Sequence, residues 1–284
     1  MKFSVLMSVY SGDSPCFFDL SIESIWSKQI ATPEEIVIVK DGFLPEDLES
    51  VLLKWKSIIG EKLNLVSISR NEGLGKALNI GLTQCKHELV ARMDADDVAV
   101  AERFLLQLEW FSQNSSLDVV GSNAWEIDNS GRIQRIREMP TDHNDIIKTL
   151  WACPLLHPTV MFKKEKIISA GNYNPSLRRR QDYELWFRCA EMGYRFANIP
   201  QPLLKYRFDR DGHNKQTPGT AWQQGIIGYR GCESVAKSLN VQVPILNKYA
   251  CFVPFFRSLL PRRLQNFMYD KLSPFDPRSR TRLD

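Results

Sequence analysis

The chain has 284 residues, of which 43% are hydrophobic and 25% charged, and its formal net charge is +4. This composition excludes a disordered chain and predicts a soluble globular protein of one large domain, with length to spare for an appendage. Six cysteines without a Cys-x-x-Cys pair argue against a zinc site or a disulfide framework and favour a reducing cytoplasm. No stretch approaches the ~18 to 20 apolar residues of a transmembrane helix.

The positive charge is concentrated at the end of the chain. Residues 257–284 include seven basic and three acidic residues, which accounts for the whole net charge of +4. A field over the whole surface, as duplex nucleic acid requires, is therefore not expected. Because the basic residues alternate with aromatic and aliphatic ones, we expect this tail to contact an anionic membrane surface or, alternatively, to pack on the rest of the protein.

Alternating strand and helix patterns fill the first part of the chain. Periodicity predicts strands over 3–9, 35–39, 64–68 and 88–93, and helices over 17–27, 44–59, 73–84 and 101–114. The first strand is followed by Ser-Gly-Asp-Ser-Pro and not by a signal-peptide cleavage site. Four strand and helix units in this order predict an α/β fold with a mostly parallel sheet and helices on both faces.

The pattern changes after residue 114. Two strands, 117–128 and 132–139, flank the turn signal Asn129-Ser130-Gly131, which indicates an antiparallel excursion. A helix over 142–151, a strand over 158–162, and helices over 164–170 and 182–192 follow. Residues 208–218 are polar and are predicted to form a loop.

Three carboxylates lie directly after the apolar run 89–93, in the sequence Asp94-Ala95-Asp96-Asp97. Carboxylates crowded at the end of a strand repel one another unless a cation joins them, and hard divalent ions prefer oxygen ligands. One or two of these aspartates therefore form a candidate Mg²⁺ or Mn²⁺ site that could also hold a diphosphate. The alternative is that Asp94 and Asp96 only cap a helix beginning near Val98.

The other predicted strands also end in polar side chains. Ligands bind outside the carboxyl ends of the strands in open α/β sheets, and these ends carry Tyr10, Asp41, Arg70 and Asn71. An aromatic ring, a carboxylate, a guanidinium and a metal-ready cluster together suit a nucleoside diphosphate. No complete Gly-x-Gly-x-x-Gly fingerprint and no P-loop is present, which disfavours dinucleotides and P-loop hydrolysis of ATP or GTP.

Six short motifs in a fixed order carry a resemblance to a known family. They are Ser8-Val9-Tyr10, Val39-Lys40-Asp41-Gly42, the segment 71–81 (Asn-Glu-Gly-Leu-Gly-Lys-Ala-Leu-Asn-Ile-Gly), Ala91 to Asp97, His157 to Met161, and Gln181 to Trp186. Over roughly residues 1–207 the chain resembles family 2 glycosyltransferases, the inverting GT-A enzymes of bacterial surface polysaccharide synthesis. The resemblance implies a GT-A fold with a nucleotide-binding sheet, a smaller antiparallel acceptor-side part and a helical C-terminal tail.

The resemblance also implies site roles. Asp41 corresponds to the aspartate that contacts uracil, and Asp94 and Asp96 correspond to the Asp-x-Asp pair that binds nucleotide and metal, either Mn²⁺ or Mg²⁺. Asp182 corresponds to the general base, at a helix start where the helix dipole favours an anion; an ordinary N-cap is its alternative. Lys40 departs from the family pattern, since many relatives have an aspartate at this position.

Three further residues are weaker candidates. Arg180, in the run Arg178 to Arg180, could hold Asp182 or a phosphate of the acceptor. His157 is expected either to be buried and hydrogen-bonded or to face the acceptor. His213 lies in the polar loop, from which a third metal ligand could come.

Together these observations predict an inverting transferase that moves a hexose, glucose or galactose, from a UDP-sugar to a polyprenyl-diphosphate-linked glycan in O-antigen or exopolysaccharide synthesis. The expected division is a catalytic domain over 1–218, with a nucleotide-sugar half (1–114) and an acceptor half (115–218), and a basic helical region over 219–284. The expected location is the inner face of the bacterial plasma membrane. Alternatives are a sugar-nucleotide pyrophosphorylase and a non-catalytic carbohydrate-binding subunit.

Overall fold

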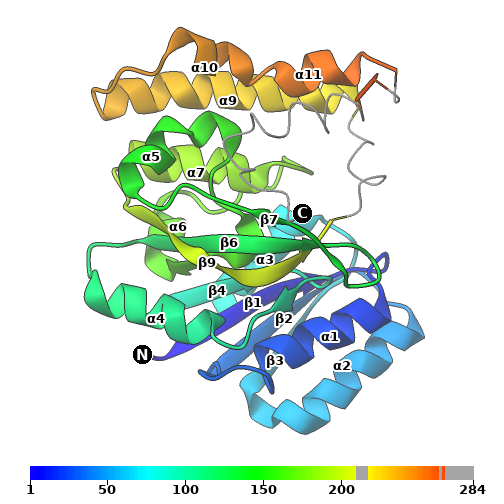
Figure 1. The fold of residues 1–284 in the computed structure, drawn as a ribbon. Helices are drawn as coiled ribbons and strands as arrows, with labels where there is room; N and C mark the ends of the chain where they lie inside the picture. Colours follow the sequence, from blue (N-terminus) through cyan, green and yellow to red (C-terminus); the bar gives the residue numbers. More distant parts are fainter. Residues whose placement is uncertain (209–216, 262–263, 266–284) are drawn as a thin grey trace.

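One mixed sheet runs through the part of the chain that the structure, a computed structural model, describes: residues 1–208, 217–261 and 264–265. Within these residues nine strands pair in the order β3-β2-β1-β4-β8-β6-β9-β5, with β7 beside β6 (Figure 1). The strands are β1 (Phe3–Val9), β2 (Glu35–Asp41), β3 (Leu63–Ile68), β4 (Leu89–Met93), β5 (Val98–Ala99), β6 (Val119–Ile127), β7 (Ile133–Arg137), β8 (Met161–Lys163) and β9 (Phe196–Arg207).

The helices follow the expected alternation and then continue beyond it. They are α1 (Pro15–Ile25), α2 (Glu46–Ile59), α3 (Leu74–Gln84), α4 (Arg103–Gln113), α5 (His143–Lys148), α6 (Lys164–Ser169), α7 (Gln181–Glu191), α9 (Pro218–Ser238), α10 (Ile245–Ala250) and α11 (Val253–Ser258). Three short 3-10 turns, η1 (Gly60–Lys62), η2 (Leu150–Ala152) and η3 (His157–Thr159), lie between these elements.

Both faces of the sheet are buried, which explains the continuous apolar strands. Phe3, Val5 and Met7 of β1 belong to one core cluster with α1 and α2, whereas Leu6 belongs to a second cluster with α3 and α7. Successive side chains of a strand point to opposite faces, so a strand covered on both sides must be apolar throughout. The parallel pairs β1 with β2, β1 with β4 and β2 with β3 confirm the predicted parallel half.

Two strands were not predicted from the sequence. The alternative of a helix beginning near Val98 is wrong, because Val98 and Ala99 form β5, an edge strand antiparallel to β9. Strand β9 contains Pro200 and Pro202, which cannot donate to a ladder and so hide the strand pattern. The register between β6 and β9 shifts at this point, and Asn123 Nδ2 donates to the Pro200 carbonyl at 2.7 Å.

The strand expected over 158–162 begins later. Residues His157–Thr159 form the turn η3, because Pro158 favours the first turn of a helix, and β8 follows antiparallel to β4. The hairpin over β6 and β7 is antiparallel, as the turn signal predicts. The polar loop expected over 208–218 lies mostly outside the described residues, which include neither 209–216 nor His213.

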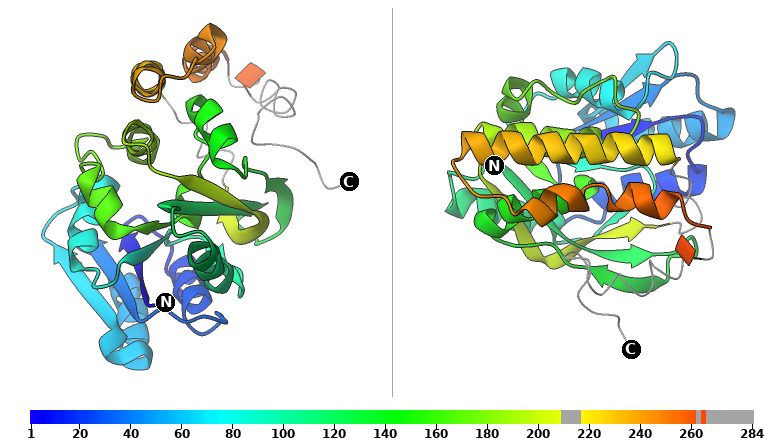
Figure 2. Two further views of the ribbon diagram at one scale, coloured as in Figure 1. Left: turned by 90° about the vertical axis from the view of Figure 1, so that its left-hand side faces the viewer. Right: turned by 90° about the horizontal axis from the view of Figure 1, so that it is seen from above.

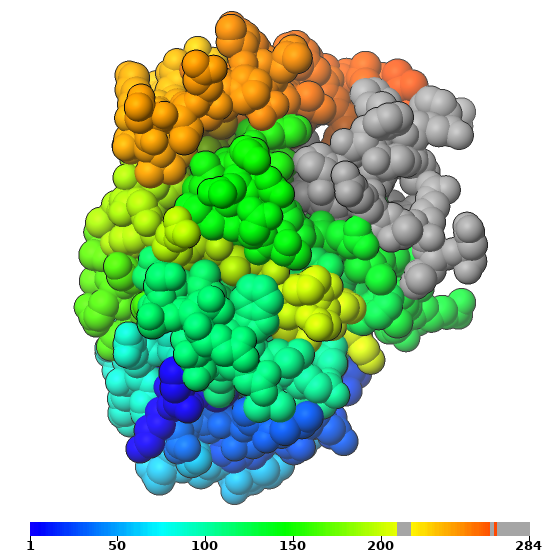
Figure 3. All heavy atoms as spheres, turned by 60° about the vertical axis from the view of Figure 1, so that its left-hand side comes forward, coloured from blue at the N-terminus to red at the C-terminus, as the bar shows by residue number. Residues whose placement is uncertain are grey.

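The C-terminal helices form an outer layer. Helix α9 lies against α7, and α10 and α11 lie beside α9 in the same outer layer (Figures 1 and 2). Gly228 and Gly231 permit this close approach, since a Cβ there would lie 2.3 Å from Tyr183 Oη and 2.3 Å from Phe187 Cγ. In the space-filling view these helices cap one side of the molecule (Figure 3). No helix of the described residues has the length and apolar character needed to cross a bilayer.

Candidate active site

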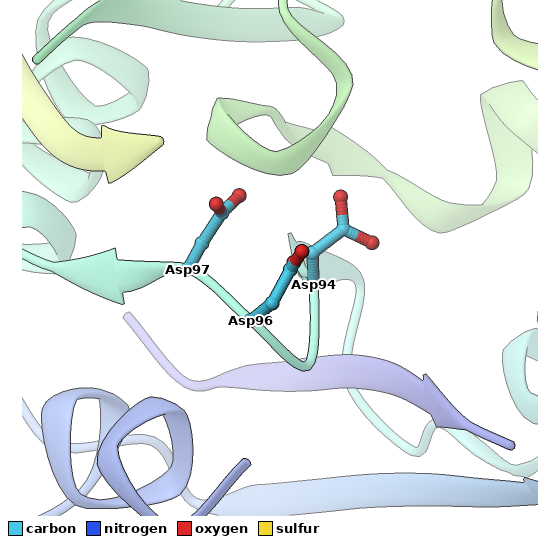
Figure 4. A group of neighbouring side chains, drawn as sticks. All are labelled: Asp94, Asp96 and Asp97. Carbon is cyan, nitrogen blue, oxygen red and sulfur yellow. The ribbon is translucent and has the colours of Figure 1, made fainter. Parts of the chain in front are cut away.

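The acidic turn between β4 and β5 brings three carboxylates together. Ligand oxygens of Asp94, Asp96 and Asp97 all lie within 4.8 Å of one another (Figure 4). Because β5 begins at Val98, this turn links two strands and does not cap a helix. From the sequence, Asp94 and Asp96 are the predicted metal ligands and Asp97 is not. The structure groups Asp97 with both of them.

Burial and crowding raise the pKa values of carboxylates in and near this turn. Partial desolvation, followed by the charge of Asp94, raises the pKa of Asp96 to about 6. Burial, followed by the charges of Asp96 and Asp94, raises the pKa of Asp97 well above its ordinary value. Asp13 in the loop after β1 has a pKa raised to about 7, first by burial and then by Asp96 and Asp94. A divalent cation among these oxygens would relieve the repulsion, so the donor set fits Mn²⁺ or Mg²⁺.

A buried arginine holds one of the three carboxylates. Arg92 on β4 is 1% exposed, and its Nη2 forms an ion pair with Asp94 Oδ1. Its Nε and Nη1 have no hydrogen-bond partner among the described residues. The buried Arg103 on α4 donates from Nη2 to the Arg92 carbonyl at 2.7 Å. Asp94 is thus oriented from beneath by a fixed positive charge.

Arg207, the last residue of β9, ties the acidic turn to the distant hairpin. Its backbone N–H donates to Asp97 Oδ1 at 2.7 Å, and its Nε donates to the Asp96 carbonyl at 2.9 Å. Its Nη1 donates to the Asp128 carbonyl at 2.8 Å, and the guanidinium lies 3.8 Å from the Phe17 ring centroid. Sequence reasoning missed this residue, because all its partners are remote along the chain.

The end of β2 is fixed by the loop that follows β3. Asp41 is 3% exposed, and its two oxygens accept backbone N–H bonds from Glu72 at 2.7 Å and Gly73 at 2.9 Å. Gly42 follows with φ +92°, and a Cβ there would lie 2.8 Å from the Asn71 nitrogen. Each oxygen of Asp41 keeps a second lone pair, so its predicted contact with uracil stays a prediction.

The remaining predicted nucleotide ligands surround this edge. Tyr10 follows β1 and is 46% exposed, which leaves part of its ring available to a base. Asn71 donates from Nδ2 to the Asp41 carbonyl at 3.4 Å. Arg70 is exposed and forms an ion pair with Glu72 at 2.6 Å. The structure therefore joins Asp41 and Asn71 directly and leaves Arg70 at the surface.

The start of α7 meets the same loop. Arg178 Nη1 donates to Asn71 Oδ1 at 3.3 Å. Arg180 takes a left-handed conformation with φ 66° and is the N-cap, without a side-chain capping bond. Asp182 lies inside the first turn and is half-buried, so the alternative of an ordinary N-cap is wrong. Its carboxylate is free for another role near the helix N-terminus.

Tyr173 connects the helix α7 side with the acidic turn. Burial raises the pKa of its hydroxyl, Asp182 and Asp94 raise it further, and Arg92 opposes them. The charges of all three residues therefore act on one phenol. Asn79, within the motif 71–81, fixes the Tyr173 backbone by donating to its carbonyl at 2.7 Å and accepting from its N–H at 2.9 Å. Neither residue was singled out in the sequence.

His157 has the buried role. It is 7% exposed, and its Nε2 lies 3.0 Å from the Tyr173 hydroxyl. Burial, followed by the charge of Arg92, lowers the pKa of the imidazole well below its ordinary value. A neutral histidine behind Tyr173 supports the site from within. The acceptor role of His157 is therefore not favoured by its position, and Arg180 is the remaining acceptor candidate.

Comparison with known proteins identifies the family of this chain. The family model "Glycosyl transferase family 2" matches residues 4–187. The chain is 33% identical over 270 residues to the amylovoran biosynthesis glycosyltransferase AmsE of Erwinia amylovora, covering 95% of this chain and 98% of that protein. It is 32% identical over 279 residues to the UDP-Gal:alpha-D-GlcNAc-diphosphoundecaprenol beta-1,3-galactosyltransferase of Escherichia coli, covering 95% and 96%.

The fold is also that of a solved structure. The crystal structure of S. aureus TarS 1-349 in complex with UDP-GlcNAc superposes with a TM-score of 0.64 at 18% identity, covering 97% of this chain and 75% of that one. This likeness confirms the α/β fold of GT-A type expected from the sequence. Together with the family match, it shows that the chain belongs to glycosyl transferase family 2.

Proposed function

We propose that this protein is a metal-dependent inverting hexosyltransferase, which transfers glucose or galactose from a UDP-sugar to a polyprenyl-diphosphate-linked saccharide. The observation that carries the proposal is the cluster of Asp94, Asp96 and Asp97 directly after β4, in a chain that belongs to glycosyl transferase family 2. The E. coli relative is named for UDP-Gal and a diphosphoundecaprenol acceptor, and the Erwinia relative for amylovoran synthesis. O-antigen or exopolysaccharide assembly is the corresponding pathway class.

The donor lies across the strand ends in this proposal. Tyr10 flanks the uracil, and Asp41 accepts from the base while the loop holding Asn71 and Arg70 lies beside it. The contact between Arg178 and Asn71 supports this placement, because it links the nucleotide loop to the start of α7. The strand-end position of every one of these residues matches the general rule for open α/β sheets.

Asp94 and Asp96 would hold the metal, with Asp97 behind them. A bound Mn²⁺ or Mg²⁺ would neutralise the diphosphate as it leaves. Asp96 is the exposed member of the cluster, and Asp94 is about one-third exposed at 32%. Asp97 is buried and fixed by the Arg207 backbone, so its role is to complete the negative field. His213, proposed as a third ligand, lies outside the described residues.

Asp182 acts as the general base. It accepts the proton of the acceptor hydroxyl while that oxygen attacks the anomeric carbon from the face opposite the diphosphate, which inverts the configuration. Asp182 suits this role because it lies in the first turn of α7 without capping the helix. Arg180, two residues earlier at the N-cap of α7, would bind a phosphate of the acceptor.

The acceptor implies a location. A polyprenyl chain is anchored in the membrane, so the enzyme would act as a peripheral protein on the inner face of the bacterial plasma membrane. The basic C-terminal tail would contact that surface, with no role for nucleic acid. The catalytic domain would comprise residues 1–218 and the tail-bearing helical region residues 219–284.

A donor and acceptor screen tests the proposal. Purified protein with Mn²⁺ is offered UDP-glucose, UDP-galactose and their N-acetylated forms, together with a synthetic GlcNAc-diphosphate lipid, and the linkage of the product is read by NMR. One UDP-hexose should yield a β-linked disaccharide lipid. Formation of a UDP-sugar from UTP and a sugar phosphate would instead indicate a pyrophosphorylase. Saccharide binding without turnover of any donor would indicate a non-catalytic subunit.

A further inference from the structure

The outermost helices carry an apolar face that nothing in the described structure covers. Six large apolar residues of α10, α11 and the following residue are 52–81% exposed. They are Ile245, Leu246, Tyr249, Val253, Phe256 and Leu259. We propose that this face, here called the outer face, inserts into an anionic lipid monolayer. The inference deepens the membrane contact of the proposed function by naming the surface that makes it.

The same helices are anchored by their opposite side. Phe252 and Phe255 each pack with their ring centroids 5.0 Å from that of Trp222 on α9. A Cβ at Gly225 of α9 would lie 2.4 Å from Phe252 Cδ1, so the glycine gives the ring its place. Cys251 is 3% exposed. Phe252 and Phe255 therefore hold the helices on the protein.

The spacing of the exposed residues follows from this anchoring. Ile245 and Tyr249 are four residues apart on α10, and Val253 and Phe256 are three residues apart on α11, so each pair lies on one face of its helix. Helices α10 and α11, which carry these residues, lie beside α9 in the outer layer of the molecule (Figure 2). Two short helices with one side fixed and one apolar side exposed have the form of an interfacial anchor lying in the membrane plane.

The charge of this segment favours an anionic lipid surface over a second copy of the chain. Residues 241–264 contain four basic residues, Lys248, Arg257, Arg262 and Arg263, and no acidic residue. Lys248 pairs with Glu233 of α9 at 3.5 Å, so the three arginines supply the excess positive charge of the segment. A second copy of the chain on this face would bring like charges together, which opposes self-association. An anionic lipid surface supplies the opposite charge, and exposed Tyr249 and Phe256 suit the boundary between head groups and acyl chains.

Vesicle flotation of the full chain, without donor or acceptor, tests the outer face. Vesicles of phosphatidylcholine with phosphatidylglycerol should bind the protein more tightly than phosphatidylcholine alone, and high salt should weaken the binding. The double variant Leu246→Ser and Phe256→Ser should lose affinity by at least about tenfold, because it removes two large apolar side chains from the inserted surface. Both residues are exposed, so the fold should persist, as circular dichroism would verify.

The matched control lies on α2. Leu53 and Ile58 are 67% and 55% exposed, and their change to serine should leave vesicle binding unaltered. Equal binding by wild type and the Leu246/Phe256 variant would overturn the inference. So would a wild-type dimer that this variant converts to a monomer without a change in vesicle binding, because the face would then join two copies.

Transfer assays separate this inference from the proposed function. The Leu246/Phe256 variant should keep its rate on a short, water-soluble acceptor and lose rate on a long-chain acceptor in vesicles. If vesicle binding behaves as expected but no UDP-sugar is used, the proposed function fails and the outer face stands. If transfer is normal and the variant still binds vesicles like wild type, the outer face fails and the proposed function stands.

Discussion

Arg92 places a fully buried guanidinium against the carboxylate of Asp94. Two of its nitrogens lack a partner in the described residues, so the guanidinium relies on Asp94 for its charge compensation. Arg103, whose own pKa is lowered to about 9 chiefly by burial, adds a second positive charge nearby. Asp94 therefore has a structural partner, whereas the charge that acts most strongly on the neighbouring Asp96 is the like charge of Asp94. The two residues of the Asp-x-Asp pair should respond oppositely to neutralisation.

The change Asp94→Asn should destabilise the metal-free protein. It leaves the buried charge of Arg92 unpaired, at a cost of roughly 2–3 kcal/mol, below the range for a fully buried pair because Asp94 is 32% exposed. Asp96→Asn should instead leave the free energy of unfolding equal or raise it by up to about 1 kcal/mol, since it removes repulsion at an exposed site. Denaturant unfolding in EDTA measures both changes.

The matched result is functional. Both variants should lose Mn²⁺-dependent transfer. Asp94→Asn should lose stability as well as activity, whereas Asp96→Asn should lose activity and keep its stability. Full activity of Asp96→Asn in EDTA would contradict the metal assignment. Equal destabilisation by the two variants would contradict the special role of the Arg92 ion pair.

Metal stabilisation should depend on pH. Asp96 and Asp13 have pKa values of about 6 and about 7, above the ordinary 3.8. From the ordinary pKa up to these raised values, the native state therefore binds more protons than the unfolded state. Their contribution to stability is therefore greatest at low pH and is lost as pH rises through about 6 to 7. A divalent ion needs the deprotonated carboxylates, so Mn²⁺ should raise Tm at pH 7.5 and have little effect at pH 5.

Thermal unfolding with and without Mn²⁺ at the two pH values measures this effect. The difference in Tm between metal-free wild type and Asp96→Asn should be smaller at pH 5 than at pH 7.5, because Asp96 is then protonated in the wild type. A Tm increase by Mn²⁺ that is as large at pH 5 as at pH 7.5 would exclude these carboxylates as the binding groups.

The change Asp182→Asn should abolish proton transfer while keeping the shape of the side chain. Asparagine cannot accept the acceptor's proton, so kcat should fall by at least about 100-fold with little change in UDP affinity. Steady-state kinetics and UDP titration measure the two quantities. Glu184→Gln, in the same first turn but paired with Arg188 at 2.8 Å, is the matched control and should retain UDP binding and most of kcat. Loss of UDP binding with kcat preserved would mean that Asp182 serves the nucleotide.

The change Arg207→Gln should weaken metal binding although Arg207 is not itself a metal ligand. The backbone bond to Asp97 remains, but the guanidinium bonds to the Asp96 and Asp128 carbonyls are lost. Mutation of residues that hold the metal ligands typically lowers metal affinity by about 10- to 100-fold. Calorimetric titration with Mn²⁺ measures the change. Lys205→Gln, an exposed change on the same strand, should bind Mn²⁺ like wild type, and an unchanged affinity in Arg207→Gln would remove its positioning role.

The sequence alone predicts the parallel half of the sheet and the place of the site within it. Strand β1 has the bounds expected from its apolar run, and β2, β3 and β4 differ by at most two residues at either end. These features are local: each follows from the periodicity of a short segment and the turn residues beside it. Asp94 and Asp96 could be placed near Asp41 because parallel strands share one carboxyl edge.

Tertiary structure alone decided how these residues are held. Arg207 reaches Asp97 across 110 positions, and Asn79 reaches Tyr173 across 94. Strand β9 forms despite Pro200 and Pro202, because its pairing with β6 outweighs two missing donors. The division of the C-terminal aromatics into anchoring and exposed sets likewise depends on α9, whose glycines receive Phe252. A local pattern shows that a side chain is apolar or charged, but its partner depends on contacts between segments that are distant in the chain.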